Sequence, residues 1–145
     1  MQPPTPSAAV PLVQVALPQP HRVGAFVRRV NRFAAEVVVD GQTLAAHVPN
    51  SGRMTELMVA GQPVVVFGEP AAHRKTACDL VLIEYQGRWV SVDSRLPSAV
   101  AAAALQAGAI PRFARYPHVR REVAYHDSRL DIELTDDTGG RALIE

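Results

Sequence analysis

A chain of 145 residues with 48% hydrophobic content has room for one ordinary domain or two very small ones, which excludes a large multidomain enzyme. The formal net charge of +1 hides a polarity along the chain, because no acidic residue precedes Glu36, whereas seven lie from Glu122 onward. Fourteen of the fifteen Lys and Arg residues are Arg, which suits bidentate contacts to phosphate, although a GC-rich genome would produce the same bias.

Cysteine usage and hydropathy point to the reducing cytoplasm. Cys78 is the single cysteine, so no internal disulfide forms, and the chain has neither a basic-then-apolar leader nor an apolar run of bilayer length. We therefore expect a cytoplasmic protein without a membrane partner. Six prolines among the first twenty residues predict that residues 1–9 form an unstructured, partly polyproline-like tail.

Residues 10–94 carry the signals of short strands and turns. Runs of β-branched or alternating residues predict strands over residues 22–30, 33–41, 42–48, 62–69, 77–85 and 88–92. The segments between them, such as VDGQ and YQGR, are typical of turns. Five or six short strands in about eighty residues predict a small OB-like or SH3-like barrel, which binds nucleic acid or sugar on one open face or serves as an inert scaffold.

The pattern changes at Pro97. Residues 96–111 begin with helix-entry residues, continue through strong helix formers and end at Gly108, which predicts a helix. A basic stretch with interleaved aromatic residues follows at 112–123, and then an acidic strand pair. A helix that leads into two antiparallel strands predicts a second, mixed α/β unit over residues 95–145, so that the expected fold class is α+β.

The last residues resemble half of a metal site. Apolar and polar side chains alternate over residues 128–134, so Asp131 and Glu133 are expected to point outward together. If the DDTGG turn forms a hairpin centred on Thr138, the numbers of opposed residues sum to 276 and Asp131 faces Glu145. Opposed side chains lie about 4.5–5.5 Å apart at Cβ, and two carboxylates that close favour a shared hard cation such as Mg2+.

Two other arrangements of this hairpin remain open. In the first, the strands form a hairpin whose two acidic residues lie on the solvent-exposed face and bind no metal. A register slip of one residue would also place Glu145 on the opposite face of the sheet.

Several stretches resemble the sugar fermentation stimulation protein (SfsA) family. The matching segments are RRVNRF (28–33), HVPNSGRM (47–54), RKTACDL (74–80), WVSVDSRLPS (89–98), LQAGAIP (105–111), and REVAYHDSRLDIEL (121–134) followed by ALIE. They occur in the order found in the family and cover most of the chain from about residue 10 onward. HVPNSGRM together with SRLD is the most specific part of the resemblance.

The resemblance implies an N-terminal OB-like barrel that binds nucleic acid, followed by a domain similar to the PD-(D/E)xK nucleases. Asp131 and Glu145 then match the two acidic residues of that motif, with Mg2+ or Mn2+ as the expected cofactor. The family continues from this glutamate into a Val-Lys-Ser run and a further half-domain, so we expect a truncated relative that lacks the motif lysine. His126 also stands where relatives tend to have glycine, and residues 101–104 are alanines where relatives often carry glutamates.

Candidates for contact with nucleic acid lie in two parts of the first unit. Arg28, Arg29, Arg32 and Phe33, with Arg74 and Lys75 in a second loop, combine positive charge with a stacking platform, as single strands require; Phe33 is equally compatible with the core. His47, Asn50 and Arg53 in HVPNSGRM can cradle a phosphate. Their alternatives are an ordinary turn and a hydrogen-bonded structural histidine.

A third group of basic residues lies near the acidic strands. Arg112, Arg115, Arg120 and Arg121 are interleaved with Phe113 and Tyr116, and Arg129 follows. They predict an electrostatic track beside the metal site or, equally, a solvated connector. Asp79 and Asp93 are assigned to a barrel edge or a linker.

We therefore expect a protein that binds DNA, or RNA, beside an incomplete nuclease-like metal site, and leave open whether it is an enzyme. The alternative is a non-catalytic DNA-binding regulator of sugar-utilisation (maltose) genes. A third possibility is a fragment without independent function. Sequence alone leaves the oligomeric state unknown.

Overall fold

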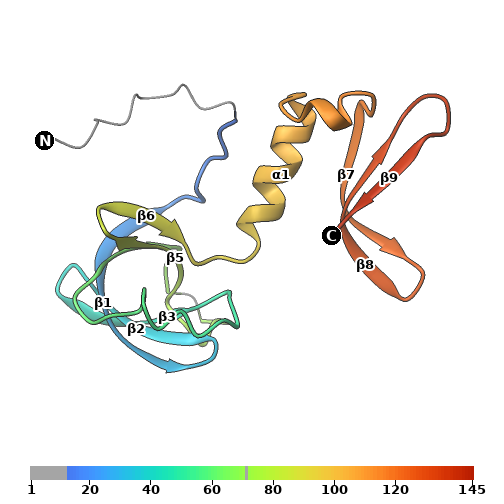
Figure 1. Ribbon diagram of the computed structural model, residues 1–145. Coiled ribbons are helices and arrows are strands. Elements are labelled where there is room, and N and C mark those ends of the chain that lie inside the picture. Colours follow the sequence, from blue (N-terminus) through green and yellow to red (C-terminus); the bar gives the residue numbers. More distant parts are fainter. Residues whose placement is uncertain (1–12, 71) are drawn as a thin grey trace, which may run out of the picture. The chain divides into compact units, whose positions relative to one another are not determined.

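The computed structural model describes residues 13–70 and 72–145. The tail predicted over residues 1–9 lies outside the described residues. The chain divides into two compact units, Ala16–Leu96 and a second that contains Pro97–Glu145 (Figure 1). In the described residues, no helix has the length and apolar character needed to cross a membrane.

The first unit is a six-stranded sheet in the order β3-β2-β1-β4-β5-β6. Its strands are β1 (His21–Asn31), β2 (Ala34–Val39), β3 (Gln42–His47), β4 (Pro63–Phe67), β5 (Cys78–Tyr85) and β6 (Arg88–Ser91). All six strands predicted from the sequence are confirmed. Strand β5 also pairs with β3 in parallel, through Ala46 with Cys78 and His47 with Asp79. This pairing brings two polar residues from distant parts of the sequence next to each other.

Local sequence explains the hairpins of this unit. Asp40 and Gly41 connect β2 to β3 with φ angles of 51° and 77°, and Val39 pairs with Gln42 across the turn. An Asp-Gly pair accepts positive φ at both positions, which a two-residue hairpin turn of this type requires. Gln86 and Gly87 repeat the arrangement between β5 and β6, with φ angles of 51° and 76°.

The core of the first unit follows the period of two along the strands. In β2 the burial alternates, so that Val37 and Val39 are buried while Glu36 and Val38 are partly exposed. The largest fully buried side chains around them include Phe26, Leu80, Ile83, Val64 and Val66. The residues of β1 and β2 that alternate with the buried ones point to the surface, where polar side chains are accommodated.

The second unit contains one α-helix, one short 3-10 helix and three strands. These are α1 (Leu96–Gln106), the 3-10 turn Pro111–Phe113, β7 (His118–Tyr125), β8 (Ser128–Thr135) and β9 (Arg141–Ile144), with the strands in the order β7-β8-β9. The predicted helix is confirmed. It ends at Gln106, two residues before Gly108, whose φ is +65°. The N–H of Ala109 bonds the carbonyl of Ala104 at 2.9 Å, a closure that glycine favours.

Strand β7 was not predicted. The basic residues from 112 onward predict a track or a connector, whereas His118–Tyr125 pairs with β8 along its whole length. In residues 118–123, the first six of β7, the apolar residues are Val119 and Val123. Three charged residues, Arg120, Arg121 and Glu122, lie between them, so the alternation typical of a strand is weak. Glu122 has a φ of 56°, so the chain departs from regular alternation where the pattern is weakest. The second unit therefore has three antiparallel strands instead of two.

Helix α1 packs its apolar residues on the sheet of its own unit. Ala102 and Leu105 share a buried cluster with Ile132 and Leu134 of β8. The predicted inward direction of Ile132 and Leu134 is thus confirmed. The residues between them on β8 belong to the opposite face of the sheet.

Candidate nucleic-acid interface

Two neighbouring hollows lie on the first unit where β1 passes into β2. The smaller, of about 400 Å³, is lined by Arg29, Arg32, Ser51, Gly52, Arg53 and Thr55. The larger, of about 660 Å³, is lined by Phe33, Ala34, Ala35, Glu36, Ala45, His47, Lys75 and Thr76. Val30 and Asn31 border both. The structure thus brings together predicted contact residues from three separate segments of the sequence.

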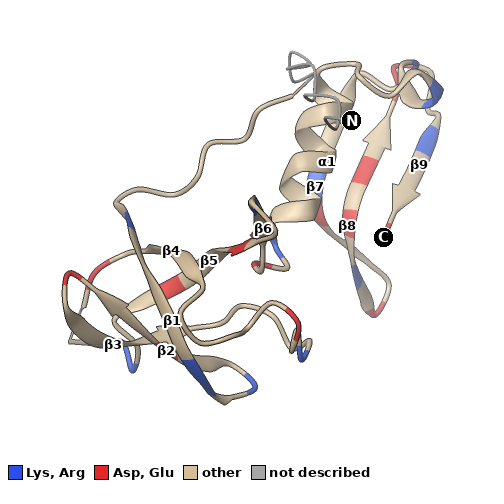
Figure 2. Ribbon diagram, turned by 60° about the vertical axis from the view of Figure 1, so that its left-hand side comes forward, with Lys and Arg blue, Asp and Glu red and all other residues tan. Residues whose placement is uncertain are grey.

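Three basic side chains at these hollows face solvent. Arg32, Arg53 and Lys75 are exposed and form no ion pair within residues 13–70 and 72–145. Figure 2 shows basic residues at the end of β1 and in the turn that follows it. The Arg32 guanidinium lies 5.9 Å from the centre of the Phe33 ring, within the range of a cation–π contact. The surface therefore combines free positive charge with an aromatic ring.

Arg29 has a different environment from its basic neighbours. Its guanidinium donates hydrogen bonds to the carbonyl oxygens of Asn31 (3.1 Å), Arg32 (2.5 Å), Asn50 (3.1 Å), Gly52 (2.7 Å) and Arg53 (2.8 Å). Burial lowers the pKa of this guanidinium below its usual value. Since its N–H donors bond carbonyl oxygens within the chain, Arg29 stabilises the loop at residues 50–53. It thereby also fixes the backbone positions of Arg32 and Arg53.

Two asparagine side chains shape the same region. The N–H of Gly52 donates to Asn50 Oδ1 at 2.8 Å, and the N–H of Phe33 donates to Asn31 Oδ1 at 2.9 Å. Such bonds from a side chain to the backbone two residues on stabilise turns. Asn50, predicted to contact nucleic acid, thus bonds to its own loop.

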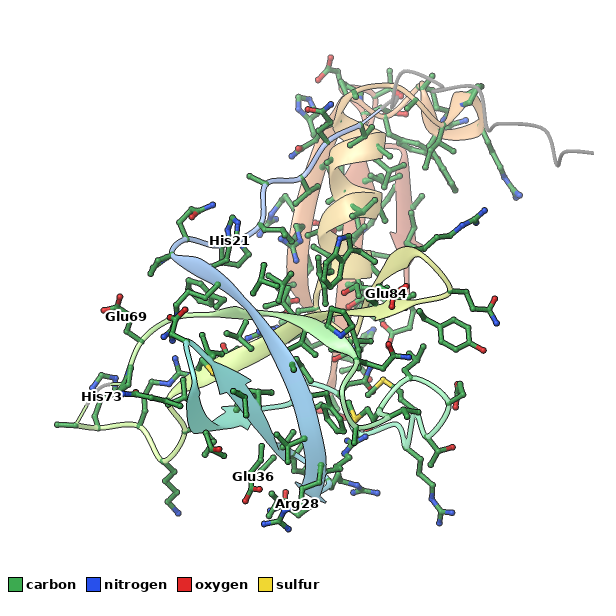
Figure 3. The ribbon with its side chains drawn as sticks, turned by 90° about the vertical axis from the view of Figure 1, so that its left-hand side faces the viewer. His21, Arg28, Glu36, Glu69, His73 and Glu84 are labelled. Carbon is green, nitrogen blue, oxygen red and sulfur yellow. The ribbon has the colours of Figure 1, made fainter. Side chains whose placement is uncertain are left out.

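Arg28 lies on β1 opposite Glu36 of β2, a directly paired position. Its Nε donates to Glu36 Oε2 at 2.8 Å and its Nη2 to Oε1 at 2.5 Å, and Figure 3 shows the two side chains next to each other. The pair is largely exposed, so its contribution to stability is small, on the order of 0–1 kcal/mol.

A cluster of ion pairs lies at the parallel pairing of β3 with β5. Asp79 is 9% exposed, and its Oδ1 lies 2.5 Å from Arg74 Nη2 and 3.4 Å from His47 Nδ1. Arg95 Nη2 lies 3.9 Å from Asp79 Oδ2 and 2.6 Å from Asp93 Oδ2. His47 lines the larger hollow, so this cluster is in direct contact with the interface.

Asp93 lies in the segment that connects β6 to α1, as its assignment to a linker predicted, and Asp79 lies on β5. Burial opposes the charge on Asp93, but hydrogen bonds from the Arg95 side chain and N–H outweigh it and hold the pKa of Asp93 below its usual value. Sequence reasoning also missed Arg95. The available signal was that all three lie within RKTACDL and WVSVDSRLPS, stretches that carry the family resemblance.

In the second unit, several predicted contact residues pair with acidic neighbours. Glu133 is 6% exposed, and its carboxylate lies 3.4 Å from Arg120 Nη1 and 2.6 Å from Arg141 Nη2. Glu133 lies on the face of β8 opposite Ile132 and Leu134, as predicted, and arginines of both neighbouring strands cover it there. Arg129 Nε lies 2.8 Å from Glu122 Oε2.

The rest of the predicted basic track is exposed. Arg112, Arg115 and Arg121 are exposed, and the guanidinium of Arg115 lies 4.6 Å from the centre of the Tyr116 ring. Tyr116 and Phe113 pack against the buried cluster of the second unit. The aromatic residues of this stretch thus serve the core more than the surface.

The predicted register of the final hairpin is confirmed. Four opposed pairs, from Thr135 with Arg141 to Ile132 with Ile144, have numbers that sum to 276. Asp131 and Glu145 occupy the next position of that register, just beyond the end of β9, and both are exposed. Within the part of the chain that the structure describes, no group of three or more His, Cys, Asp or Glu residues lies close enough to hold a metal ion.

Comparison with known families gives two adjoining matches. Residues 27–92 match the SfsA N-terminal OB domain, and residues 95–145 match the sugar fermentation stimulation protein RE domain. Together the two matches cover residues 27–145 except for residues 93 and 94.

Curated relatives are described as sugar fermentation stimulation protein homologs. The chain is 41% identical to that of Natranaerobius thermophilus over 125 residues, covering 84% of this chain and 52% of the relative. It is 46% identical to that of Desulforamulus reducens over 120 residues, covering 83% and 49%. The chain therefore spans about half the length of the curated relatives it matches.

A solved structure has the same fold. The structure of Pyrococcus furiosus SfsA in complex with Ca2+ aligns with a TM-score of 0.76 and 26% identity. The alignment covers 94% of this chain and 57% of the Pyrococcus furiosus chain.

Proposed function

The chain belongs to the sugar fermentation stimulation protein (SfsA) family, and from this premise we propose that it binds nucleic acid through the two hollows of its first unit. One observation carries the proposal. Arg32, Arg53 and Lys75, exposed and without ion pairs in the described residues, come from three loops to the two adjoining hollows, and the exposed ring of Phe33 lines the larger one. Cationic side chains attract the phosphate backbone, and an aromatic ring offers a surface for base stacking.

The strand pairing supports an OB-type barrel as the scaffold of this interface. Hydrogen-bonded pairing passes from β1 through β2 and β3 to β5, and from β5 through β4 back to β1. We propose that these five strands close a small barrel, since such closure leaves no free strand edge and keeps the loops that carry Arg32 and Lys75 in fixed positions.

A salt titration tests the proposal. Binding of a fluorescein-labelled oligonucleotide to the full chain is measured by anisotropy at increasing salt, and affinity should fall steeply because bound phosphates release counterions. Arg32→Ala and Lys75→Ala should each weaken binding and reduce the slope of log affinity against log salt by about 1. The control is Arg88→Ala, an exposed arginine of the same unit that lines neither hollow. Salt-independent binding, or equal loss in all three variants, would contradict the proposal.

Metal-assisted cleavage of the bound strand is a second candidate function. The Pyrococcus furiosus relative was solved with Ca2+, and the register of β8 and β9, continued one residue beyond Ile144, would set Glu145 opposite Asp131. Mg2+ often binds through one or two carboxylates together with substrate phosphates and water, which suits this donor set. We propose that Asp131 and Glu145 would hold such an ion, which would supply Lewis-acid stabilisation of phosphate charge.

Calorimetry tests the metal proposal without an activity assay. Because the proposed site supplies two carboxylates, the heat of Mg2+ binding should be weak with the protein alone and stronger once a phosphodiester oligonucleotide is present. Asp131→Asn should remove that enhancement. The matched control is Asp127→Asn, which changes an exposed carboxylate at the β7–β8 turn. Unchanged enhancement in Asp131→Asn would reject the site.

A role as a regulator of sugar-utilisation genes stays a prediction. It requires that the protein prefer particular DNA sequences and leave the bound DNA intact.

A further inference from the structure

The two hollows differ in the chemistry of their linings. The smaller one is lined by three arginines and by the hydroxyl residues Ser51 and Thr55. The larger one is lined by Phe33 and three alanines, with His47 and Lys75 as its basic residues. Because Val30 and Asn31 border both hollows, a cationic surface lies directly beside one that combines Phe33 and the alanines with the polar residues Glu36, His47, Lys75 and Thr76.

We propose that this pair of hollows selects single-stranded over double-stranded nucleic acid, with a base stacked on Phe33 and a neighbouring phosphate held by Arg32 or Arg53. The inference rests on the proposed function and specifies the class of its ligand. A hollow of about 660 Å³ lies within the range of about 300–1,000 Å³ in which proteins enclose small organic groups. A base is a group of that kind, with a flat apolar face and polar edges.

Phe33 is held in place for such a contact. The N–H of Phe33 bonds to Asn31 Oδ1 at 2.9 Å, and its carbonyl accepts a hydrogen bond from the N–H of Val48 at 2.8 Å. The residue nevertheless remains 49% exposed. Both bonds restrain the backbone from which the ring projects, so the loop loses less conformational entropy on binding.

A duplex cannot use this arrangement. Base pairing and stacking bury the faces of the bases inside a double helix, and an unpaired strand exposes them. A duplex would contact Arg32, Arg53 and Lys75 through its phosphates and leave Phe33 without a partner. The ring thus distinguishes the two forms, whereas the cationic residues serve both.

The test compares three labelled ligands with the full chain at one salt concentration. These are a thymidine oligonucleotide, an abasic deoxyribose-phosphate strand of equal length, and a duplex of equal length. Phe33→Leu should weaken binding of the thymidine strand by roughly 5- to 150-fold, the range for loss of one stacked base, and leave the other two ligands unchanged. Phe33→Trp should restore binding, since it restores an aromatic face.

Trp89→Leu is the matched control. Trp89 belongs to the same unit, is also 49% exposed, and lines neither hollow. Its replacement should leave all three affinities unchanged. Unfolding curves of each variant identify any loss of binding that reflects loss of the fold, and the rescue by Phe33→Trp separates stacking from such loss.

The possible results separate this inference from the proposed function. If the duplex binds as tightly as the thymidine strand and Phe33→Leu changes neither, the single-strand inference is overturned, while loss of binding in Arg32→Ala would still support a nucleic-acid interface. If none of the three ligands binds at low salt, both are overturned. Selective loss of the thymidine strand in Phe33→Leu, recovered in Phe33→Trp, supports both.

Discussion

Arg29 Nη1 donates a hydrogen bond to the carbonyl oxygen of Gly52 at 2.7 Å, which connects β1 to a loop 23 residues further along the chain. The same guanidinium bonds four other carbonyl oxygens of the two loops around the smaller hollow. A loop without regular secondary structure thus obtains its shape from one charged side chain. The position of Arg53 at the proposed interface depends on it.

Replacing Arg29 should therefore cost stability. We expect Arg29→Met to lower the free energy of unfolding by about 1–3 kcal/mol, because hydrogen bonds from a charged donor are lost while the carbonyls become partly hydrated. Arg28→Met is the control, since Arg28 has one exposed carboxylate partner and should cost at most about 1 kcal/mol. Urea unfolding monitored by Trp89, the single tryptophan of the chain, reports on this unit. Equal losses in both variants would contradict the role given to Arg29.

Gly24 lies where β1 passes close to β2. A Cβ atom at this position would lie within 2.3 Å of the backbone carbonyl oxygen of Val38, a distance that requires the strands to move apart. We expect Gly24→Ala to cost at least the roughly 1–3 kcal/mol of an overpacked core. Gly61→Ala is the comparison, because its Cβ would meet nothing within 4 Å and only its φ of +88° opposes the change. A smaller loss for Gly24→Ala than for Gly61→Ala, measured by urea unfolding, would contradict this explanation.

The ion pair of Asp93 should make stability depend on pH. Its pKa is lower in the folded chain than its ordinary value, because hydrogen bonds from Arg95 outweigh the opposing effect of burial. The unfolded chain then binds the proton more readily, so the contribution is present above the unfolded pKa and is lost as pH falls through the folded one. Asp93→Asn should therefore reduce stability at pH 6, by no more than about 1 kcal/mol because Arg95 is exposed.

The pH profile provides the check on this prediction. Urea unfolding of both proteins is compared at pH 6 and at pH values below the ordinary carboxyl range. The difference between wild type and Asp93→Asn should shrink as the solution becomes more acidic. A difference that is constant with pH would show that the carboxylate charge contributes nothing.

Cys78 should be unreactive in the folded protein. Burial raises the pKa of its thiol, and the residue is fully buried in the core of the first unit. Since the thiolate is the reactive form, labelling by iodoacetamide at pH 8 should be slow in buffer and fast in concentrated urea. Rapid labelling under native conditions would mean that β5 is accessible to solvent.

The repeating patterns of the sequence predicted the regular elements because each depends on neighbours within a few residues. Alternation over residues 22–30 and 77–85, the Asp-Gly turn at residue 40, and the run of helix formers ending at Gly108 all act locally. The register of the final hairpin was predictable for the same reason, since a tight turn determines which residues are opposed. Strand β7 was not predicted because Glu122 interrupts the alternation of its sequence. Its stability comes from pairing with β8, which the local sequence does not reveal.

Local sequence patterns predicted eight strands, one helix and the residue types that are available for contact with a polyanion. Tertiary packing sets which of those charges remain free. Arg29, Arg74 and Arg120 interact with groups of the chain itself, whereas Arg32, Arg53 and Lys75 remain exposed at the two hollows. The physical reason is that an arginine's partner is set by which distant strands and loops pack beside it, and no local pattern encodes that packing.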